Sequence, residues 1–151
     1  MSVPSPLGRL QLAAVDAGLC AIEFGEEMRR SETCPQDVHP HLELARRELD
    51  LYFAGNLRAF SVPLVVRGSP FEECVWNALG RIPWGATISY ADLARDIGKP
   101  TASRAVGGAN GRNRIPIVIP CHRVVNRNGA IGGYSGGVAR KEFLLRLERL
   151  S

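Results

Sequence analysis

The feature that most constrains this chain is a change of hydrophobic period at Gly68-Ser69-Pro70. Before this point, short stretches show the pattern of strands with one buried face. After it, apolar residues recur every three or four positions, which is the spacing of amphipathic helices. Glycine and proline also favour a break between folded segments. The sequence therefore predicts two domains, a first that contains strands in residues 1–67 and a mainly helical second in residues 68–151.

The first domain has the pattern of a β-hairpin followed by a helix. Residues 8–14 and 19–24 read as strands, and Asp16-Ala17-Gly18 between them is a turn signal. Pro40 is suited to the first turn of a helix, which we expect to run to residue 53. Residues 60–66 are a further strand candidate.

The second domain has four stretches with helical spacing. We expect helices at residues 71–82, 90–97, 101–111 and 138–150. Ser89 and Thr101 are placed as N-caps, because their hydroxyls can accept a backbone hydrogen bond at a helix start. Residues 129–137 are rich in glycine and are expected to form a long loop.

The net charge of +4 is concentrated in one part of the chain. Between residues 95 and 127 the only acid is Asp96, whereas the basic residues are Arg95, Lys99, Arg104, Arg112, Arg114, Arg123 and Arg127. Such a stretch is a candidate surface for phosphate binding. The alternative is a solvated positive face.

The sequence shows neither a membrane span nor a secretory signal. No apolar run approaches the roughly 18 residues that cross a bilayer, and residues 1–12 lack a basic region followed by an apolar stretch. We therefore expect a cytoplasmic protein with reduced thiols. Cys20 and Cys74 fit buried apolar positions, and Cys34 lies in a polar loop. No C-x-x-C pair is present, so structural zinc is not expected.

Residues 89–111 have the layout of a helix-turn-helix. The second of its predicted helices is rich in alanine and glycine, which makes it intrinsically weak. Its small side chains would allow close approach to a nucleic-acid groove, and Arg104 could reach into a duplex. The alternative is close packing against other helices, so the pattern alone leaves both interpretations open.

Cys121 stands in the most informative segment of the chain. Ile117, Val118 and Ile119 predict a buried strand that Pro120 ends, since proline cannot donate to a sheet ladder. A cysteine attacks as its thiolate, and a neighbouring base makes that form accessible. On extended backbone, Cys121 and His122 would point to opposite sides. We therefore expect a bridging water, and not His122 directly, to take the proton from Cys121.

The run from Ile119 to Tyr134 resembles the active-site signature of the 6-O-alkylguanine-DNA alkyltransferases, also called methylated-DNA–protein-cysteine methyltransferases. It reads Pro120-Cys121-His122-Arg123-Val124, followed by Gly129, Gly132, Gly133 and Tyr134. Further matches are Ser5-Pro6-Leu7-Gly8, which resembles the family's opening strand, Ser89-Tyr90, Leu93-Ala94, Arg104-Ala105-Val106-Gly107, Asn113 and residues 141–145. The five-residue string is highly specific, and the resemblance covers nearly the whole chain.

The resemblance implies an α/β N-terminal domain with a small antiparallel, ribonuclease-H-like sheet. It also implies a mainly α, winged-helix-like C-terminal domain with a helix-turn-helix and the active site. In such proteins Cys121 would accept the alkyl group, His122 would act through a water as general base, and Glu148 would orient His122. Asn113 would organise the turn near the active site. The thioether formed on Cys121 is a very poor leaving group, so the protein would act once.

The family resemblance also implies how DNA is handled. The alkylated guanine, with alkylthymine as a second candidate, must leave the duplex to react. Tyr90 would help to rotate the nucleotide, and Arg104 would fill the space that the base vacates. The residues expected at the DNA are Tyr90, Arg104, Ser103, Ala105, Gly107, Lys99 and Arg127, in contact with the minor groove. The residues expected around the base are Tyr134, Ser135 and Val124. We expect a monomer that binds double-stranded DNA and needs no cofactor and no metal.

Two positions depart from the family pattern. Arg114 stands where the family commonly has proline after the asparagine, which alters the turn and adds a charge near the DNA side. Arg149 replaces the glycine that usually follows the glutamate of the last helix, so this helix is expected to extend further. Some relatives bind zinc in the N-terminal domain, but the matching positions here include Cys20 without a full set of ligands, so no structural zinc is expected.

Two other functions fit parts of the pattern. A cysteine hydrolase could use Cys121 and His122, but it would need an oxyanion hole and a third orienting group, and the small-residue helix would have no purpose in it. A sequence-specific regulator could use the helix-turn-helix without any need for Cys121. Turnover of small esters would distinguish the first, and full function of a Cys121→Ser variant would distinguish the second.

Overall fold

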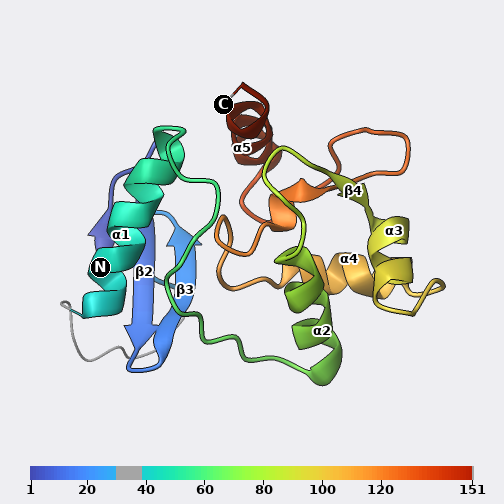
Figure 1. Ribbon diagram of the computed structural model, residues 1–151, viewed down its shortest axis with the longest axis horizontal. Coiled ribbons are helices and arrows are strands. Elements are labelled where there is room, and N and C mark those ends of the chain that lie inside the picture. Colours follow the sequence, from blue (N-terminus) through green and yellow to red (C-terminus); the bar gives the residue numbers. More distant parts are fainter. Residues whose placement is uncertain (30–38, 151) are drawn as a thin grey trace. The chain divides into compact units, whose positions relative to one another are not determined.

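The computed structural model describes residues 1–29 and 39–150, and the chain divides into two compact units, Met1–Val66 and Arg67–Ser151. The first unit is a three-stranded antiparallel sheet with one helix. The strands β1 (Ser2–Val3), β2 (Leu10–Val15) and β3 (Gly18–Phe24) follow one another in the order β1-β2-β3. The helix α1 (Pro40–Phe53) lies along β2 and β3 (Figure 1). The predicted hairpin and the predicted helix over residues 40–53 are confirmed.

The segment after α1 is anchored to β3 without forming a strand. A single bridge pairs Leu19 with Leu64, with the Leu19 N–H donating to the Pro63 carbonyl at 2.8 Å. A Cβ atom on Gly18 would lie 2.4 Å from the same carbonyl oxygen, so only glycine permits this approach. The expected strand over residues 60–66 is therefore wrong, because its backbone reaches the sheet at one point only.

A buried carboxylate fixes the same segment to α1. Glu48 is 5% exposed, and its oxygens accept from the backbone N–H groups of Ser61 and Val62 at 2.8–3.1 Å. The Ser61 hydroxyl donates to it at 3.0 Å. One side chain thus satisfies backbone donors that have no strand partner.

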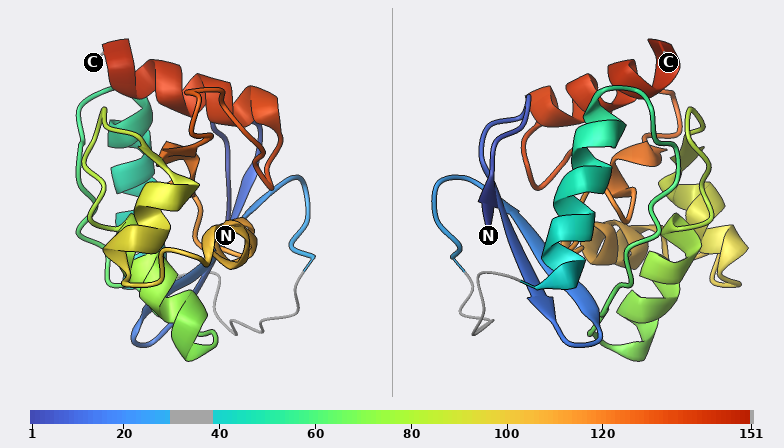
Figure 2. Two further views of the ribbon diagram at one scale, coloured as in Figure 1. Left: turned by 90° about the vertical axis from the view of Figure 1, so that its right-hand side faces the viewer. Right: turned by 60° about the vertical axis from the view of Figure 1, so that its left-hand side comes forward.

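The second unit is helical, with one short parallel pair of strands (Figure 1). Its helices are α2 (Pro70–Leu79), α3 (Tyr90–Asp96), α4 (Ser103–Gly111) and α5 (Val138–Leu150). The strands β4 (Ile88–Ser89) and β5 (Val124–Val125) pair in parallel, and a 3₁₀ turn, η1 (Cys121–Arg123), precedes β5. Helices α3 and α4 form the predicted helix-turn-helix, and α2 packs on both. Figure 2 shows η1 between α4 and α5.

Helix boundaries in this unit follow their capping residues. Ser69 and Glu72 form a reciprocal capping box that starts α2 at Pro70, and the helix ends at Leu79 rather than at the expected residue 82. Ser89 caps α3 as predicted, by accepting from the Asp92 N–H at 3.0 Å. The expectation for Thr101 is wrong, because α4 begins after Ala102 without a side-chain cap. Helix α5 continues beyond Glu148 to Leu150, as the arginine at 149 predicted.

Four further expectations fail in the structure or lie outside it. Residues 117–119 form a buried turn and not a strand, with Ile117 in the left-handed region at a φ of 76°. Residues 5–8 form the turn between β1 and β2, closed by the Ser5 hydroxyl on the Gly8 carbonyl, and not an opening strand. Cys74 is exposed and not buried, whereas Cys20 is buried as expected. Cys34 lies outside the described residues.

Within the described part of the chain, no helix has the length and apolar character needed to cross a membrane.

The contacts of Glu48 predict a large effect of its removal on stability. We expect Glu48→Ala to lower the free energy of unfolding by about 2 kcal/mol, because it leaves the buried Val62 N–H without an acceptor. Asp50→Ala in the same helix is the matched control: it removes an exposed ion pair with Arg46 and should cost less than about 1 kcal/mol. Urea unfolding followed by circular dichroism compares the two variants, and equal losses would contradict the anchoring role of Glu48.

Candidate active site

Cys121 begins η1, and the turn before it is held by an asparagine. The Asn113 amide donates to the Ile119 carbonyl at 2.8 Å and accepts from the Ile115 N–H at 3.0 Å. The Cys121 N–H in turn donates to the Ile119 carbonyl at 2.8 Å. Asn113 therefore sits at the turn where the sequence placed it, and it satisfies backbone groups that a strand would have paired.

The thiol of Cys121 lies inside the second unit. The residue is 1% exposed. Burial raises the pKa of Cys121 to about 11, although the nearby Asn113 amide and the Lys141 ammonium oppose this rise. At neutral pH the group is thus a thiol, and it must lose a proton before it can act as a nucleophile.

His122 is oriented by a carboxylate from the last helix. Its Nε2 lies 2.7 Å from Glu148 Oε2, and both residues are buried. Since a carboxylate only accepts, Nε2 carries the hydrogen and Nδ1 presents its lone pair. Nδ1 is buried and makes no hydrogen bond to any of the described residues. Burial lowers the pKa of His122, while Glu148 acts in the opposite direction, so the imidazole is a neutral base.

The expected geometry of the Cys-His pair was wrong in one respect. The two residues lie in a 3₁₀ turn and not on extended backbone, so the argument from alternating side chains does not apply. One ring nitrogen of His122 is nevertheless unavailable for proton transfer from Cys121, for a different reason. The Nε2 side of His122 is taken by Glu148, which leaves only Nδ1 for proton transfer.

Arg123 completes a buried network that the sequence analysis did not assign. Its Nε and Nη2 donate to the two oxygens of Glu148 at 2.8 and 3.0 Å, and its Nη1 donates to the Ile82 carbonyl. The arginine charge balances the carboxylate inside the protein. Glu148 therefore lies between an arginine and a neutral histidine.

Lys141 is a second residue of the candidate site, and no role for it follows from the sequence. It is fully buried, and its Nζ donates to the Val124 carbonyl at 2.7 Å and to the Gly133 carbonyl at 3.0 Å. These bonds fix the glycine-rich loop to β5, and the charge acts on Cys121. The available signal was spacing, since the buried residues Lys141, Leu144, Leu145 and Glu148 follow the period of a single helix face.

Tyr134 and Tyr90 lie near Cys121 from two other elements. The Tyr134 hydroxyl is buried and interacts with the thiol, and burial raises its pKa well above the ordinary value. Tyr90 begins α3 and is partly buried, and burial together with the charge of Cys121 raises its pKa. The Val124 side chain is fully buried in β5, whereas Ser135 is exposed in the loop.

The residues expected at DNA lie on or beside the helix-turn-helix. Arg104 and Ala105 are exposed in the first turn of α4, after Ser103, and Lys99 is exposed in the turn before it. A Cβ on Gly107 would lie 3.8 Å from the Tyr90 ring, so α4 and Tyr90 are in contact. In the part of the chain that the structure describes, Arg104 forms no ion pair with Asp96 or any other acid.

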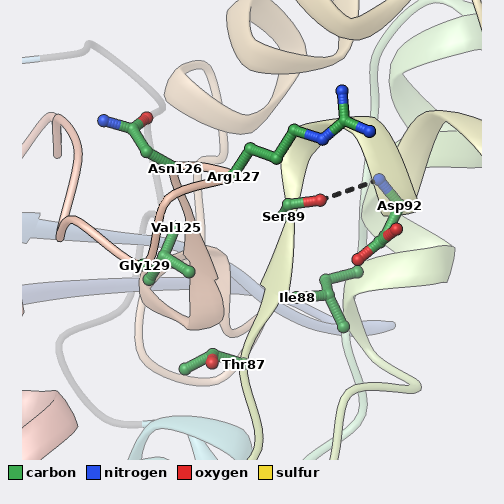
Figure 3. Close-up of a pocket in the computed structure, with 8 residues that line it drawn as sticks. All are labelled: Thr87, Ile88, Ser89, Asp92, Val125, Asn126, Arg127 and Gly129. Carbon is green, nitrogen blue, oxygen red and sulfur yellow. Dashed lines mark hydrogen bonds between the residues drawn. The ribbon is translucent and has the colours of Figure 1, made fainter.

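Arg127 borders an open polar pocket of about 260 Å³ at the end of the β4–β5 pair. Figure 3 shows its side chain reaching toward the start of α3, where Ser89 caps the helix. The other polar side chains of the pocket are Thr87, Asp92 and Asn126. The pocket thus lies one residue from Tyr90 and offers both hydroxyls and a guanidinium.

No candidate metal centre is found in residues 1–29 and 39–150, where no three or more His, Cys, Asp or Glu side chains cluster suitably. The arrangement instead supports nucleophilic chemistry. It combines a buried thiol, a neutral imidazole with a free lone pair, a carboxylate that orients this imidazole, and a cation beside the sulfur.

Comparisons with known proteins match both units. Residues 70–150 match the model of the 6-O-methylguanine DNA methyltransferase DNA-binding domain, and residues 2–66 match that of its ribonuclease-like domain. A methylated-DNA–protein-cysteine methyltransferase of Methanosarcina acetivorans is 45% identical over 95% of this chain and 94% of its own. The constitutive enzyme of Bacillus subtilis is 44% identical over 97% and 93%, respectively.

Solved structures agree with this relationship. The crystal structure of Mycobacterium tuberculosis OGT in complex with DNA superposes with a TM-score of 0.91, at 42% identity, over 99% of this chain and 91% of that one. An O6-methylguanine DNA methyltransferase from Methanococcus jannaschii superposes with a TM-score of 0.69, at 31% identity, over 100% and 94%. The chain therefore belongs to the 6-O-methylguanine DNA methyltransferase family, whose members are DNA-binding repair methyltransferases.

Proposed function

We propose that this protein repairs DNA by moving the alkyl group of an O6-alkylguanine onto Cys121, once per molecule. The observation that carries the proposal is the buried His122–Glu148 pair on the residue that directly follows the buried Cys121. A buried thiol with a raised pKa needs a base, and we assign this role to the unpartnered Nδ1 of the next residue, His122. Methylated DNA is named as the substrate of the relatives at 44–45% identity.

The proposed step balances as a single displacement. Cys121 Sγ forms a bond to the alkyl carbon, the bond from this carbon to the guanine oxygen breaks, and its electron pair stays on the guanine. The thiol proton passes through a water to His122 Nδ1. Glu148 then stabilises the imidazolium, whereas before the step its charge is balanced by Arg123.

The product explains why the protein would act only once. A thioether at Cys121 cannot ionise and is a very poor leaving group. His122 can take a proton from a water, but it does nothing to make the thioether sulfur a better leaving group. We therefore infer stoichiometric consumption in place of turnover.

The helix-turn-helix would bring the lesion to Cys121. A base inside the duplex cannot reach a residue that is 1% exposed, so the nucleotide must rotate out of the stack. Arg104 is exposed on α4 and can enter the vacated space, while Tyr90 contacts α4 at Gly107 and interacts with Cys121. The small residues of α4 suit a minor-groove approach. We further propose that the protein binds DNA as a monomer. O4-alkylthymine is proposed as a second substrate.

The first prediction concerns the acceptor. Incubation with duplex DNA that contains O6-methylguanine should add about 14 Da to the protein, at a limit of one group per molecule, as a thiolate trapped as a thioether requires. Intact-mass measurement followed by peptide mapping should place the group on Cys121. Cys121→Ser should gain no mass and still bind DNA, whereas repair of several lesions by one molecule would exclude single use.

The second prediction concerns pH. Because the pKa of Cys121 lies near 11 and that of His122 below its ordinary value, both groups stay neutral from about pH 7 to 9. The wild-type transfer rate should therefore be flat over this range and fall only below about pH 6.5, where His122 begins to gain a proton. His122→Phe removes the base, so transfer must use preformed thiolate. Its rate should be about a hundredfold lower at pH 7 and rise about tenfold per pH unit.

Single-turnover rates measured between pH 5.5 and 9.5 test this prediction. A wild-type rate that climbs tenfold per pH unit above pH 7 would show that thiolate forms without His122. A transfer rate of His122→Phe that does not change with pH would also show that removal of the thiol proton does not depend on His122.

The third prediction concerns base flipping. Arg104→Ala should slow repair of duplex DNA by on the order of tenfold or more, since flipping costs a few kcal/mol that the inserted side chain partly offsets. Reaction with free O6-methylguanine should be unchanged. Arg81→Ala, which removes an exposed arginine outside α4, is the matched control. Equal losses on the duplex and the free base would instead assign Arg104 to the fold or the pocket.

A further inference from the structure

Asn110 links the helix α4 to the backbone of the acceptor cysteine. It is 5% exposed, and its Nδ2 donates to the Cys121 carbonyl at 3.4 Å. Because a carbonyl oxygen only accepts, the NH₂ side of this amide must face Cys121. The amide oxygen Oδ1 then points away from that carbonyl. Oδ1 is buried and has no hydrogen-bond partner among the described residues.

Two buried acceptors without partners therefore belong to residues joined to Cys121, one through a hydrogen bond and one through the chain. One is Asn110 Oδ1 from α4, and the other is His122 Nδ1, on the residue that follows the carbonyl bound by Asn110. Buried polar atoms in folded proteins are as a rule satisfied, either by protein groups or by bound water. Both of these atoms accept, so neither can satisfy the other directly. A molecule that donates two hydrogens satisfies both.

We propose that Asn110 is a positioning residue of the proton relay, whose Oδ1 holds the bridging water opposite His122. This inference rests on the proposed function. The water donates one hydrogen to Asn110 Oδ1 and the other to His122 Nδ1, which leaves its oxygen to accept from the Cys121 thiol. In the transfer step the thiol proton moves to the water, and the hydrogen on the His122 side moves to Nδ1. The asparagine gains and loses no atom.

Charged and titratable groups from several elements surround this proposed water. Glu148 and Lys141 of α5, Arg123 of η1, Tyr90 of α3 and Tyr134 of the glycine-rich loop all lie in the same site. Asn110 does not titrate at any pH, so its loss can change the pH profile only through a group that it positions. The profile thus separates positioning of the relay from a purely structural role.

Asn110→Leu tests the proposal, because leucine has a similar volume and no acceptor. We expect transfer at pH 7 to be about tenfold slower with both free O6-methylguanine and duplex DNA. The flat profile between pH 7 and 9 should become a rise with pH, as in His122→Phe. The double variant should be no slower than His122→Phe alone, because the two residues act on one water. Affinity for DNA should stay within about twofold.

Val106→Ala is the matched control. Val106 is fully buried in the same helix and carries no polar side-chain atom, so its truncation weakens packing while the pH profile stays flat. Asn110→Val, which is also apolar but smaller, should repeat the result and serves where the leucine variant fails to fold.

The outcomes separate this inference from the proposed function. If Asn110→Leu and Asn110→Val lose the same factor at every pH, or if their losses multiply with that of His122→Phe, Asn110 is structural and the inference is overturned. If the wild type gains no mass on Cys121, or if His122→Phe keeps a flat profile, the proposed function or its relay fails, whatever the asparagine variants do.

Discussion

The candidate active site depends on the contacts of the Glu148 carboxylate. It holds His122 by one oxygen and Arg123 by both, and all three residues are buried. A buried carboxylate without the arginine would be strongly disfavoured, and it would also draw a proton onto the histidine. The arginine therefore permits a neutral imidazole beside an ionised acid. Since Arg123 also donates to the Ile82 carbonyl, the same network ties η1 to the segment after α2.

The last helix supplies the ammonium that acts on Cys121 and the carboxylate that binds the histidine. Lys141 and Glu148 are seven residues apart, so they share one face of α5 with Leu144 and Leu145. The helix α5 thus contributes charged side chains to the site in addition to packing against it. Its register decides which charge meets the sulfur and which meets the imidazole. A shift by one residue would replace both with side chains that point elsewhere.

The sequence predicted those elements whose pattern is long and periodic. The hairpin, α1, α3 and α5 follow from alternation, helical spacing and caps. The strand expected at residues 117–119 was wrong because three β-branched residues indicate burial but not the backbone conformation. Here Asn113 holds the segment in a turn. The two-residue strands β4 and β5 are too short to leave a pattern. Cys121, His122 and Glu148 came from the family signature, whereas Arg123, Lys141 and Asn110 required coordinates, since their partners are backbone carbonyls or distant in sequence.

The bonds from Lys141 to Val124 and Gly133 also determine when the glycine-rich loop becomes ordered. Glycine has more conformational freedom to lose than any other residue, so fixing such a loop is entropically expensive. Here a buried ammonium holds the loop to β5 in the free protein. The entropy is thus lost during folding and not during the encounter with DNA. In the proposed function, a base that leaves the duplex would meet a loop that is already ordered, so its binding energy would not be reduced by ordering that loop.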